Sequence, residues 1–425
     1  MTLNNAEQPL SPAVKRCVDN LQSPNPRLRS RAATELGELQ SPEALPFLTQ
    51  ALKDDVNTYV RSAAAESLGH IGGPEAIFPL MDALRDPSSF VRRAAAIALG
   101  QLQAKESQVA LLQLLEDPNF YVRRAAINAI GKLGIPDLGK VLLPLLETDD
   151  PRIRRTVVTA LRRLRTLEAV PRLVEMLEGY LHSPSPRDLP VVKTLVIALG
   201  ELQTQAVSPV LIRVLRGYVG ARSLAATALG RVGERQAGPA LVESLADPST
   251  SLRLAALKSL GHLGYVAAAP DVRRMLSCAD PRVRRIAAHV AGELGDHEAV
   301  PTLIAMAQKD PSPLVRPAAV EALASLGDAR ALEPLLTLVT DNNAYLRASL
   351  AFALCALDDD TPAVRRALEQ LAQDKVEHVA AATQRALQDR DNRSQPQPPA
   401  TPVSSTEHTA NQEETSWLNR LLHLG

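Results

Sequence analysis

Arginine is concentrated in the middle of this sequence, where it could bind anionic groups. Residues 152–172 contain one acidic residue, Glu168, and seven arginines. These arginines are Arg152, Arg154, Arg155, Arg162, Arg163, Arg165 and Arg172. A guanidinium group presents paired N–H donors that match a carboxylate or a phosphate. The segment therefore predicts a basic groove for an acidic protein surface, a carboxylate-bearing pigment or a phosphate, and a solvated helix face is the alternative.

Arginine also occurs in pairs at a regular interval upstream of this segment. Arg93 and Arg124 each follow another arginine directly, as Arg155 does, and the three lie 31 residues apart. Such an interval places them at one position of successive structural units. The arginines that we expect to bind a partner are Arg93, Arg124, Arg155, Arg162, Arg163 and Arg165.

Aromatic residues make up only 3% of the chain, yet several fall at comparable turns. An insertion at 179–190 contains Tyr180 and Arg187, and the shortened unit that follows contains Tyr218. Similar turns elsewhere contain Tyr59, Phe90, Phe120, Tyr121 and Tyr345. Arginine and aromatic residues together are typical of protein-binding hot spots. We expect Tyr180, Arg187 and Tyr218 to contact a partner from an exposed, stiff loop and its neighbour, whereas the alternative is that the rings pack onto the next repeat.

A repeat of 31 or 32 residues runs through most of the chain and must position these side chains. Its most regular copies begin at residues 60, 91, 122, 252 and 315 and read V-R-x-A-A-x-x-A-L-G or a close variant. Each unit is expected to contain two helices joined by a turn, with this phrase in the second helix. One helix pair cannot bury its apolar stripe alone, but stacked pairs can. The sequence therefore predicts an all-α solenoid of about 12 helix pairs.

Three residue types of the repeat are expected to have structural roles. The arginine of the phrase and an Asp of the inter-helix turns recur together, and we expect them to join neighbouring repeats. The alanines should let neighbouring helices approach closely. The glycines that close the phrase are expected to end the second helix. These glycines are Gly69, Gly100, Gly131, Gly230 and Gly261.

The repeated phrase resembles the HEAT-like repeat family of phycobilisome (bilin) lyases. The resemblance covers residues 13–388 and implies an α-solenoid, but the same repeat serves lyases, chaperone-like factors, scaffolds and a di-iron hydroxylase. The hydroxylase uses several His–Glu pairs on helices, whereas this sequence has the single pair His297–Glu298. No cysteine spacing of a metal or redox site and no phosphate-binding loop is recognisable. We therefore expect no catalytic residue, no metal ligand and no cofactor.

Charge and hydropathy limit the classes of partner. The chain has 47 basic and 47 acidic residues, so it lacks a net field that would attract nucleic acid or an anionic membrane. Nucleic acid is therefore not favoured as a partner, while contact with a membrane surface stays open. No apolar stretch approaches about 18 residues, and the N-terminus lacks the features of a signal peptide. We predict a cytoplasmic protein without a transmembrane helix.

Four parts are expected along the chain. They are a flexible N-terminus at 1–12, the solenoid at 13–388, a disordered linker rich in Pro, Gln, Ser and Thr at 389–415, and an amphipathic motif at 416–425. The apolar face of that motif contains Trp417, Leu418, Leu421 and Leu422. A helix this short is not stable alone in water. We expect it to dock on a second site or partner, and a cap on the last repeat is the alternative.

These features favour a non-catalytic scaffold or chaperone-like factor that presents an arginine-rich groove to an acidic protein. By resemblance, that protein would belong to a photosynthetic or cofactor-assembly system. The alternative function is a HEAT-type phycobilin lyase, or a lyase subunit, that attaches a bilin to a phycobiliprotein cysteine. A tetrapyrrole pocket should be rich in aromatic residues, and the repeats contain no Trp, so the lyase is placed second.

Overall fold

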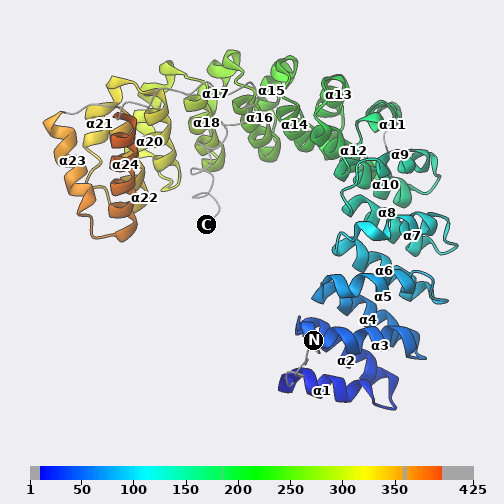
Figure 1. Cartoon of the computed structure of the whole chain (residues 1–425). Helices are drawn as coiled ribbons and strands as arrows, with labels where there is room; N and C mark the ends of the chain where they lie inside the picture. The colour runs from blue at the N-terminus through cyan, green and yellow to red at the C-terminus, as the bar shows by residue number, and fades with distance from the viewer. Residues whose placement is uncertain (1–9, 184, 358–360, 395–425) are drawn as a thin grey trace, which may run out of the picture. The chain divides into compact units, whose positions relative to one another are not determined.

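Each repeat consists of two helices that pack against each other. The computed structural model describes residues 10–183, 185–357 and 361–394, with only the backbone of 392–394, and these residues contain helices and no strand. The chain divides into two compact units, Met1–Ala299 and Val300–Gly425. Figure 1 labels most of the helices, which are numbered in chain order.

The first unit contains nine helix pairs among its described residues. The first helices are α1 (Pro12–Leu21), α3 (Leu45–Asp54), α5 (Ile77–Ala83), α7 (Gln108–Gln113), α9 (Leu138–Leu142), α11 (Val170–His182), α13 (Ser208–Gly217), α15 (Gly238–Glu243) and α17 (Ala269–Met275). The second helices are α2 (Pro26–Glu38), α4 (Thr58–Ile71), α6 (Ser89–Gln101), α8 (Phe120–Lys132), α10 (Pro151–Arg163), α12 (Leu189–Leu202), α14 (Arg222–Val232), α16 (Thr250–His262) and α18 (Pro281–Glu293).

The second unit contains three further pairs among its described residues. They are α19 (Val300–Lys309) with α20 (Val315–Leu326), α21 (Leu332–Leu336) with α22 (Ala344–Ala356), and α23 (Pro362–Ala372) with α24 (Glu377–Ser394). The twelve described pairs confirm the predicted all-α solenoid. Helix α24 continues to Ser394, beyond the expected end of the solenoid at residue 388.

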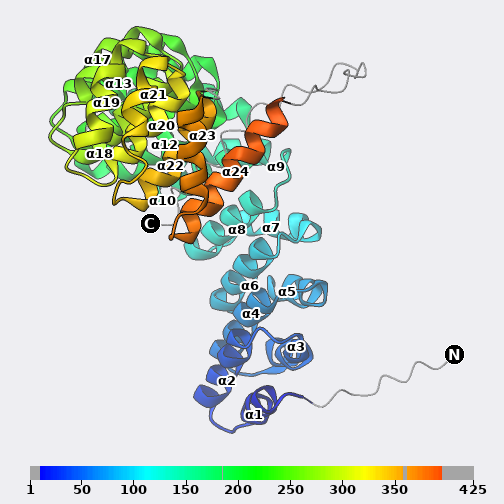
Figure 2. The same ribbon diagram turned by 90° about the vertical axis from the view of Figure 1, so that its left-hand side faces the viewer.

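Within the first unit the helices form two layers. Each second helix packs on the second helix of the next pair, and each first helix packs on its own partner. Figure 2 shows α2, α4, α6 and α8 in one layer and α1, α3, α5 and α7 in the other. Alanine makes this stacking close, because Ala64, Ala95 and Ala126 are fully buried in successive second helices. The predicted role of alanine is therefore confirmed.

The glycines of the repeated phrase do not end their helices, so that prediction was wrong. Gly131 lies inside α8, and a Cβ on it would come within 2.8 Å of Ala160 in α10. The same close approach occurs between Gly100 and Ala129. A missing Cβ at this position, here called the contact-glycine position, lets the next second helix approach.

The residue that ends most second helices lies three positions later. Gly134 has a positive φ of 68°, and Gln103, Arg165 and Gln203 adopt the same left-handed region. A residue in this conformation turns the chain away from the helix axis, so that the following N–H groups can donate to the last carbonyl oxygens of the helix. We call this the left-handed position.

The insertion at 179–190 lies between α11 and α12, as expected, but most of it is helical. Residues 179–182 complete α11, and the short 3₁₀ helix η7 (Pro186–Asp188) leads directly into α12. Proline is compatible with the first turn of a helix, where its missing N–H has no partner to lose. The predicted stiff loop was therefore wrong over most of its length.

Candidate partner-binding face

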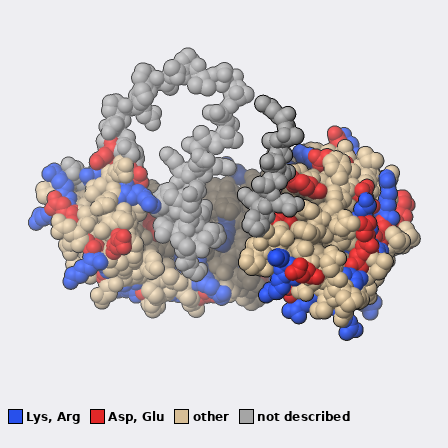
Figure 3. Space-filling model, turned by 60° about the horizontal axis from the view of Figure 1, so that its bottom comes forward, with Lys and Arg blue, Asp and Glu red and all other residues tan. Residues whose placement is uncertain are grey.

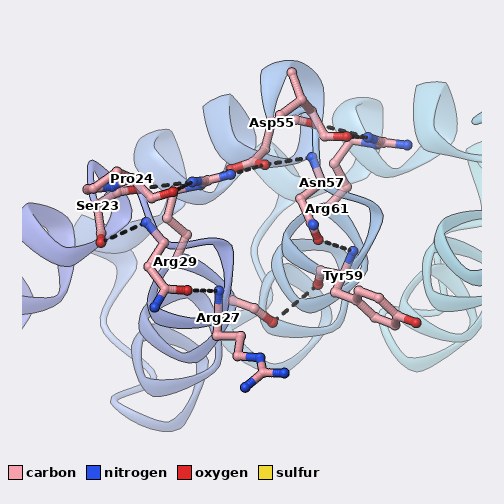
Figure 4. Close-up of polar contacts among 11 residues, drawn as sticks. Ser23, Pro24, Arg27, Arg29, Asp55, Asn57, Tyr59 and Arg61 are labelled. Carbon is pink, nitrogen blue, oxygen red and sulfur yellow. Dashed lines mark hydrogen bonds and ion pairs between the residues drawn. The ribbon is translucent and has the colours of Figure 1, made fainter.

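The repeated arginine joins consecutive repeats through an ion pair. Figure 4 shows Arg29, whose Nε donates to Oδ2 of Asp55 over 2.6 Å and whose Nη2 donates to Oδ1 over 2.9 Å. Arg29 Nη1 also donates to the carbonyl oxygen of Ser23, in the turn of its own repeat. Burial would raise the pKa of Asp55, but hydrogen bonds from Arg29 and from the Asn57 N–H outweigh it and lower that pKa. The guanidinium group thus bridges two inter-helix turns.

The same arrangement recurs in both units, with N–O distances of 2.5–2.8 Å. The pairs are Arg29–Asp55, Arg61–Asp86, Arg92–Asp117, Arg222–Asp247, Arg316–Asp341 and Arg347–Asp374. Each pair is largely buried, as for Arg92 and Asp117, whose side chains are 15% and 5% exposed. The structural interpretation of the repeated Arg and Asp is confirmed.

This ladder of ion pairs changes at the arginine-rich repeat. Thr148 takes the place of the aspartate, 25 residues after Arg123, and no described carboxylate pairs with that arginine. The next arginine, Arg154, donates to the hydroxyl oxygen of Tyr180 over 2.8 Å instead of to a carboxylate. Tyr180 lies half-buried in the last turn of α11. It therefore serves as a ladder partner. The expected position of Tyr180 in an exposed loop was wrong, while its contact with a binding partner stays a prediction.

Three arginines one position after the ladder residue remain without an ion pair among the described residues. Arg93, Arg124 and Arg155 lie on the consecutive second helices α6, α8 and α10. Arg93 and Arg124 are half-buried, Arg155 is exposed, and the Nε of Arg93 is buried without a hydrogen-bond partner. The interval in the sequence thus corresponds to one row on the stacked second helices.

Aromatic rings accompany Arg93 and Arg124 of this row at the N-terminal ends of α6 and α8. The Asn119 side chain accepts a hydrogen bond from the Tyr121 N–H and fixes the first turn of α8. Arg124 lies 5.6 Å from the Tyr121 ring centroid and 5.8 Å from that of Phe120. On α6, Arg93 lies 6.0 Å from the Phe90 ring. These separations allow cation–π attraction.

The rings themselves are largely exposed. Tyr59 on α4 is 66% exposed, and Phe90 and Tyr121 are each 51% exposed. Tyr59 and Phe90 lie 6.2 Å apart between centroids, and Arg152 of α10 lies 4.1 Å from the Phe120 ring. The predicted row of aromatic residues is therefore present on α4, α6 and α8. We call this row, with Arg93, Arg124 and Arg155, the arginine–aromatic face.

Two other predicted contact residues have different surroundings. Tyr218 is only 8% exposed, and its hydroxyl donates to the Ser185 carbonyl oxygen over 3.0 Å. Burial, with a contribution from the nearby Asp188, raises the pKa of Tyr218. Tyr218 therefore fixes the insertion against the next repeat, and its predicted surface role was wrong. Arg187 is exposed in η7, separate from the rings on α4 to α8.

The remaining predicted arginines lie at the C-terminal end of α10. Arg162 pairs with Glu201 of α12, whereas Arg163 and Arg165 are exposed and form no ion pair with a described residue. Figure 3 shows basic and acidic side chains interspersed on the side of the molecule that it draws. On that side, local groups of charge would provide the electrostatic selectivity.

Some predictions fall on parts of the chain without described structure. The predicted docking residues Trp417, Leu418, Leu421 and Leu422 lie outside the described residues, as does most of the expected linker. Within the described ranges, no helix is long and apolar enough to cross a membrane. No cluster of three or more His, Cys, Asp or Glu in those ranges could hold a metal ion.

Comparison with known proteins agrees with this architecture. The profile of HEAT repeats matches residues 14–100, 108–180, 218–277 and 272–355, and the profile of the PBS lyase HEAT-like repeat matches residues 91–117. A search of curated protein sequences finds no similar protein.

Two solved structures have a similar fold at low sequence identity. Importin beta is 14% identical, with a TM-score of 0.62 over 89% of this chain and 62% of that chain. The karyopherin Kap121p, solved bound to the extreme C-terminus of the protein phosphatase Cdc14p, is 15% identical, with a TM-score of 0.50 over 88% of this chain and 49% of that chain. This chain thus spans 49% to 62% of their lengths, and the likeness concerns the fold alone.

Proposed function

This chain belongs to the HEAT-repeat family, and on that premise we propose that it is a non-catalytic scaffold or chaperone-like factor that binds an acidic protein. Its partner would lie on the arginine–aromatic face of α4, α6, α8 and α10. The observation that supports this assignment is the row of Arg93, Arg124 and Arg155, which have no ion pair among the described residues, beside exposed rings.

The physical chemistry of this face favours a protein ligand. The repeated arginines of the ladder use their donors on aspartates, whereas these three keep donors for a carboxylate. Two of them lie against aromatic rings, which limits their motion and so reduces the entropy lost on binding. An exposed ring beside an arginine can also bury apolar area on association. Kap121p, with a similar fold, was solved with a protein segment bound.

Charge reversal on the face tests the proposal. The variant Arg93→Glu, Arg124→Glu, Arg155→Glu should lose capture of an acidic protein from extracts of the source cells. The control reverses Arg27, Arg85 and Arg235, which are exposed and, like the three arginines of the face, have no ion pair among the described residues. Both variants change the net charge equally, so a general electrostatic effect would weaken capture by both. Equal capture by the face variant and the unmodified protein would refute the proposal.

A HEAT-type bilin lyase is the second candidate. The match of the PBS lyase HEAT-like repeat to residues 91–117 favours it, because this segment includes most of α6 and Arg93. A lyase would bind a free bilin with a change in its visible absorption and would transfer it to an apo-phycobiliprotein cysteine. Absence of both effects with the full chain would remove this candidate and leave the scaffold.

A further inference from the structure

Helix α10 departs from the other second helices of the first unit at two structural positions. The contact-glycine position is Arg162 in α10, whereas the others have glycine there: Gly37, Gly69, Gly100, Gly131, Gly200, Gly230, Gly261 and Gly292. An arginine cannot allow the same close approach, and α10 contacts α12 less extensively than α4 contacts α6. Arg162 instead joins the two repeats through its ion pair with Glu201 of α12, so the close helix packing of the other repeats is replaced here by a charged contact.

The left-handed position at the end of α10 is also an arginine. Where this position is Gln103 or Gln203, the side-chain amide donates to a carbonyl oxygen of the next second helix, that of Lys132 or Arg231. Arg165 has a φ of 52° and forms no hydrogen bond with a described residue through its exposed side chain. A left-handed arginine costs about 1 kcal/mol relative to glycine. Packing between repeats therefore does not explain Arg165.

Both arginines line one hollow between the C-terminal ends of α10, α12 and α14. Its lining consists of Arg162, Arg165, Glu201, Gln203 and Arg231, and its volume is about 400 Å³. Glu201 pairs with both Arg162 and Arg231 and holds them on either side, at 2.5 Å and 3.4 Å. Three guanidinium groups and one carboxylate give the lining a formal charge of +2.

We propose that this hollow binds a dianionic oxyanion of the phosphate class, either free phosphate or a phosphate ester. A dianion neutralises the excess charge of the lining, and guanidinium groups bind phosphate oxygens through paired N–H donors. Arg165 supplies the donors that no described residue uses, while Glu201 positions the other two arginines. The hollow lies at the opposite end of the second helices from the aromatic rings. The inference is therefore independent of the proposed protein-binding function.

Calorimetric titration of the full chain with inorganic phosphate tests this assignment, at an ionic strength held constant with chloride. We expect saturable binding to the unmodified protein and a loss of about tenfold or more in Arg162→Gly/Arg165→Gln, because charge-assisted hydrogen bonds are lost. Both substitutions introduce residues that other repeats have at these positions, so the variant should fold. Arg165→Gln alone, which keeps the Arg162–Glu201 pair, provides a second variant. Glycerol phosphate distinguishes an ester site from a site for free phosphate.

Matched controls make the result specific to the hollow. Arg163→Gln removes a neighbouring exposed arginine that does not line it, and phosphate should bind this variant as it binds the unmodified protein. The proposal is overturned by absence of saturable binding or by equal losses in Arg163→Gln and the double variant. It is also overturned if succinate competes as well as phosphate, which would indicate a dicarboxylate site.

Discussion

Completing the interrupted ladder with Thr148→Asp should stabilise the first unit. Arg123 already has the required position, since its Nη1 donates to the carbonyl oxygens of Asp117 and Pro118 over 2.8 Å and 3.1 Å. Thr148 Oγ1 accepts the N–H of Asp150, as Asp117 Oδ1 accepts that of Asn119. An aspartate at position 148 would therefore face a guanidinium group that has already lost its rotational freedom.

The expected gain follows from the intact pair in the preceding repeat. Arg92 donates two hydrogen bonds to Asp117, at 2.7 Å and 3.1 Å, and hydrogen bonds to charged groups contribute about 1.5–3 kcal/mol each. Desolvation of the new carboxylate and repulsion from Glu147 and Asp149 offset much of this. We expect a net gain of about 1 kcal/mol, or roughly fivefold in the folding equilibrium. Asp117→Ala should cost more, about 2–4 kcal/mol, because it leaves a largely buried guanidinium group unpaired.

Guanidinium chloride denaturation followed by far-ultraviolet circular dichroism measures these differences. Thr148→Asn is the matched control, because it has the shape of aspartate and caps the same turn without a charge. Arg123 should lower the pKa of the introduced aspartate in the folded state. The gain in stability is therefore present above the unfolded-state pKa of about 3.9 and is lost as pH falls through the folded-state pKa. Equal stability of Thr148→Asp and Thr148→Asn at pH 7 would refute the reasoning. So would an undiminished gain in an Arg123→Ala background.

Three further predictions concern packing, acid and the C-terminus. Gly131→Ala should destabilise the first unit by about 1–3 kcal/mol, because the added Cβ would meet Ala160. The control Gly179→Ala adds a Cβ that faces open space in α11, so it should be neutral or stabilising. Chemical denaturation measures the free energy of unfolding of both variants. The hydrogen bond from Arg152 lowers the pKa of Asp150 to about 2. Titration followed by nuclear magnetic resonance should therefore show this carboxylate still ionised at pH 3. A titration midpoint near pH 4 would contradict the Arg152–Asp150 geometry. Deleting residues 395–425 should leave the denaturation midpoint of the repeats unchanged while removing one captured partner, and an unchanged set of partners would refute the predicted docking motif.

Periodicity predicted the fold because each repeat buries the same apolar positions against the next repeat. The recurrence of Arg and Asp identified the ladder, and the spacing of Arg93, Arg124 and Arg155 identified a row on adjacent helices. Periodicity does not report the distance between helices, however. The contact glycines were therefore mistaken for helix ends, although a second series of glycines three residues later, such as Gly134, was visible in the sequence.

The expectations for Tyr180 and Tyr218 failed for a related reason, because both residues lie where the repeat is irregular. Tyr180 lies 26 residues after Arg154, as Asp55 lies 26 residues after Arg29, so the spacing could have identified it as a ladder partner. Tyr218 is buried because the insertion is helical and brings Ser185 within reach of its hydroxyl. That contact depends on the path of the inserted residues, which the repeat does not specify. The repeat pattern therefore does not predict side-chain positions in irregular segments.

Hydrogen–deuterium exchange of the full chain, with and without a captured acidic partner, tests the central claim most directly. The partner should protect backbone amides in the first turns of α4, α6, α8 and α10. There the exposed rings of Tyr59, Phe90 and Tyr121 lie near arginines that have no ion pair among the described residues. The Arg93, Arg124 and Arg155 charge-reversal variant should lose this protection, and the Arg27, Arg85 and Arg235 control should keep it. Protection confined to the first helices, or unchanged in the face variant, would contradict the assignment of the arginine–aromatic face as the binding surface.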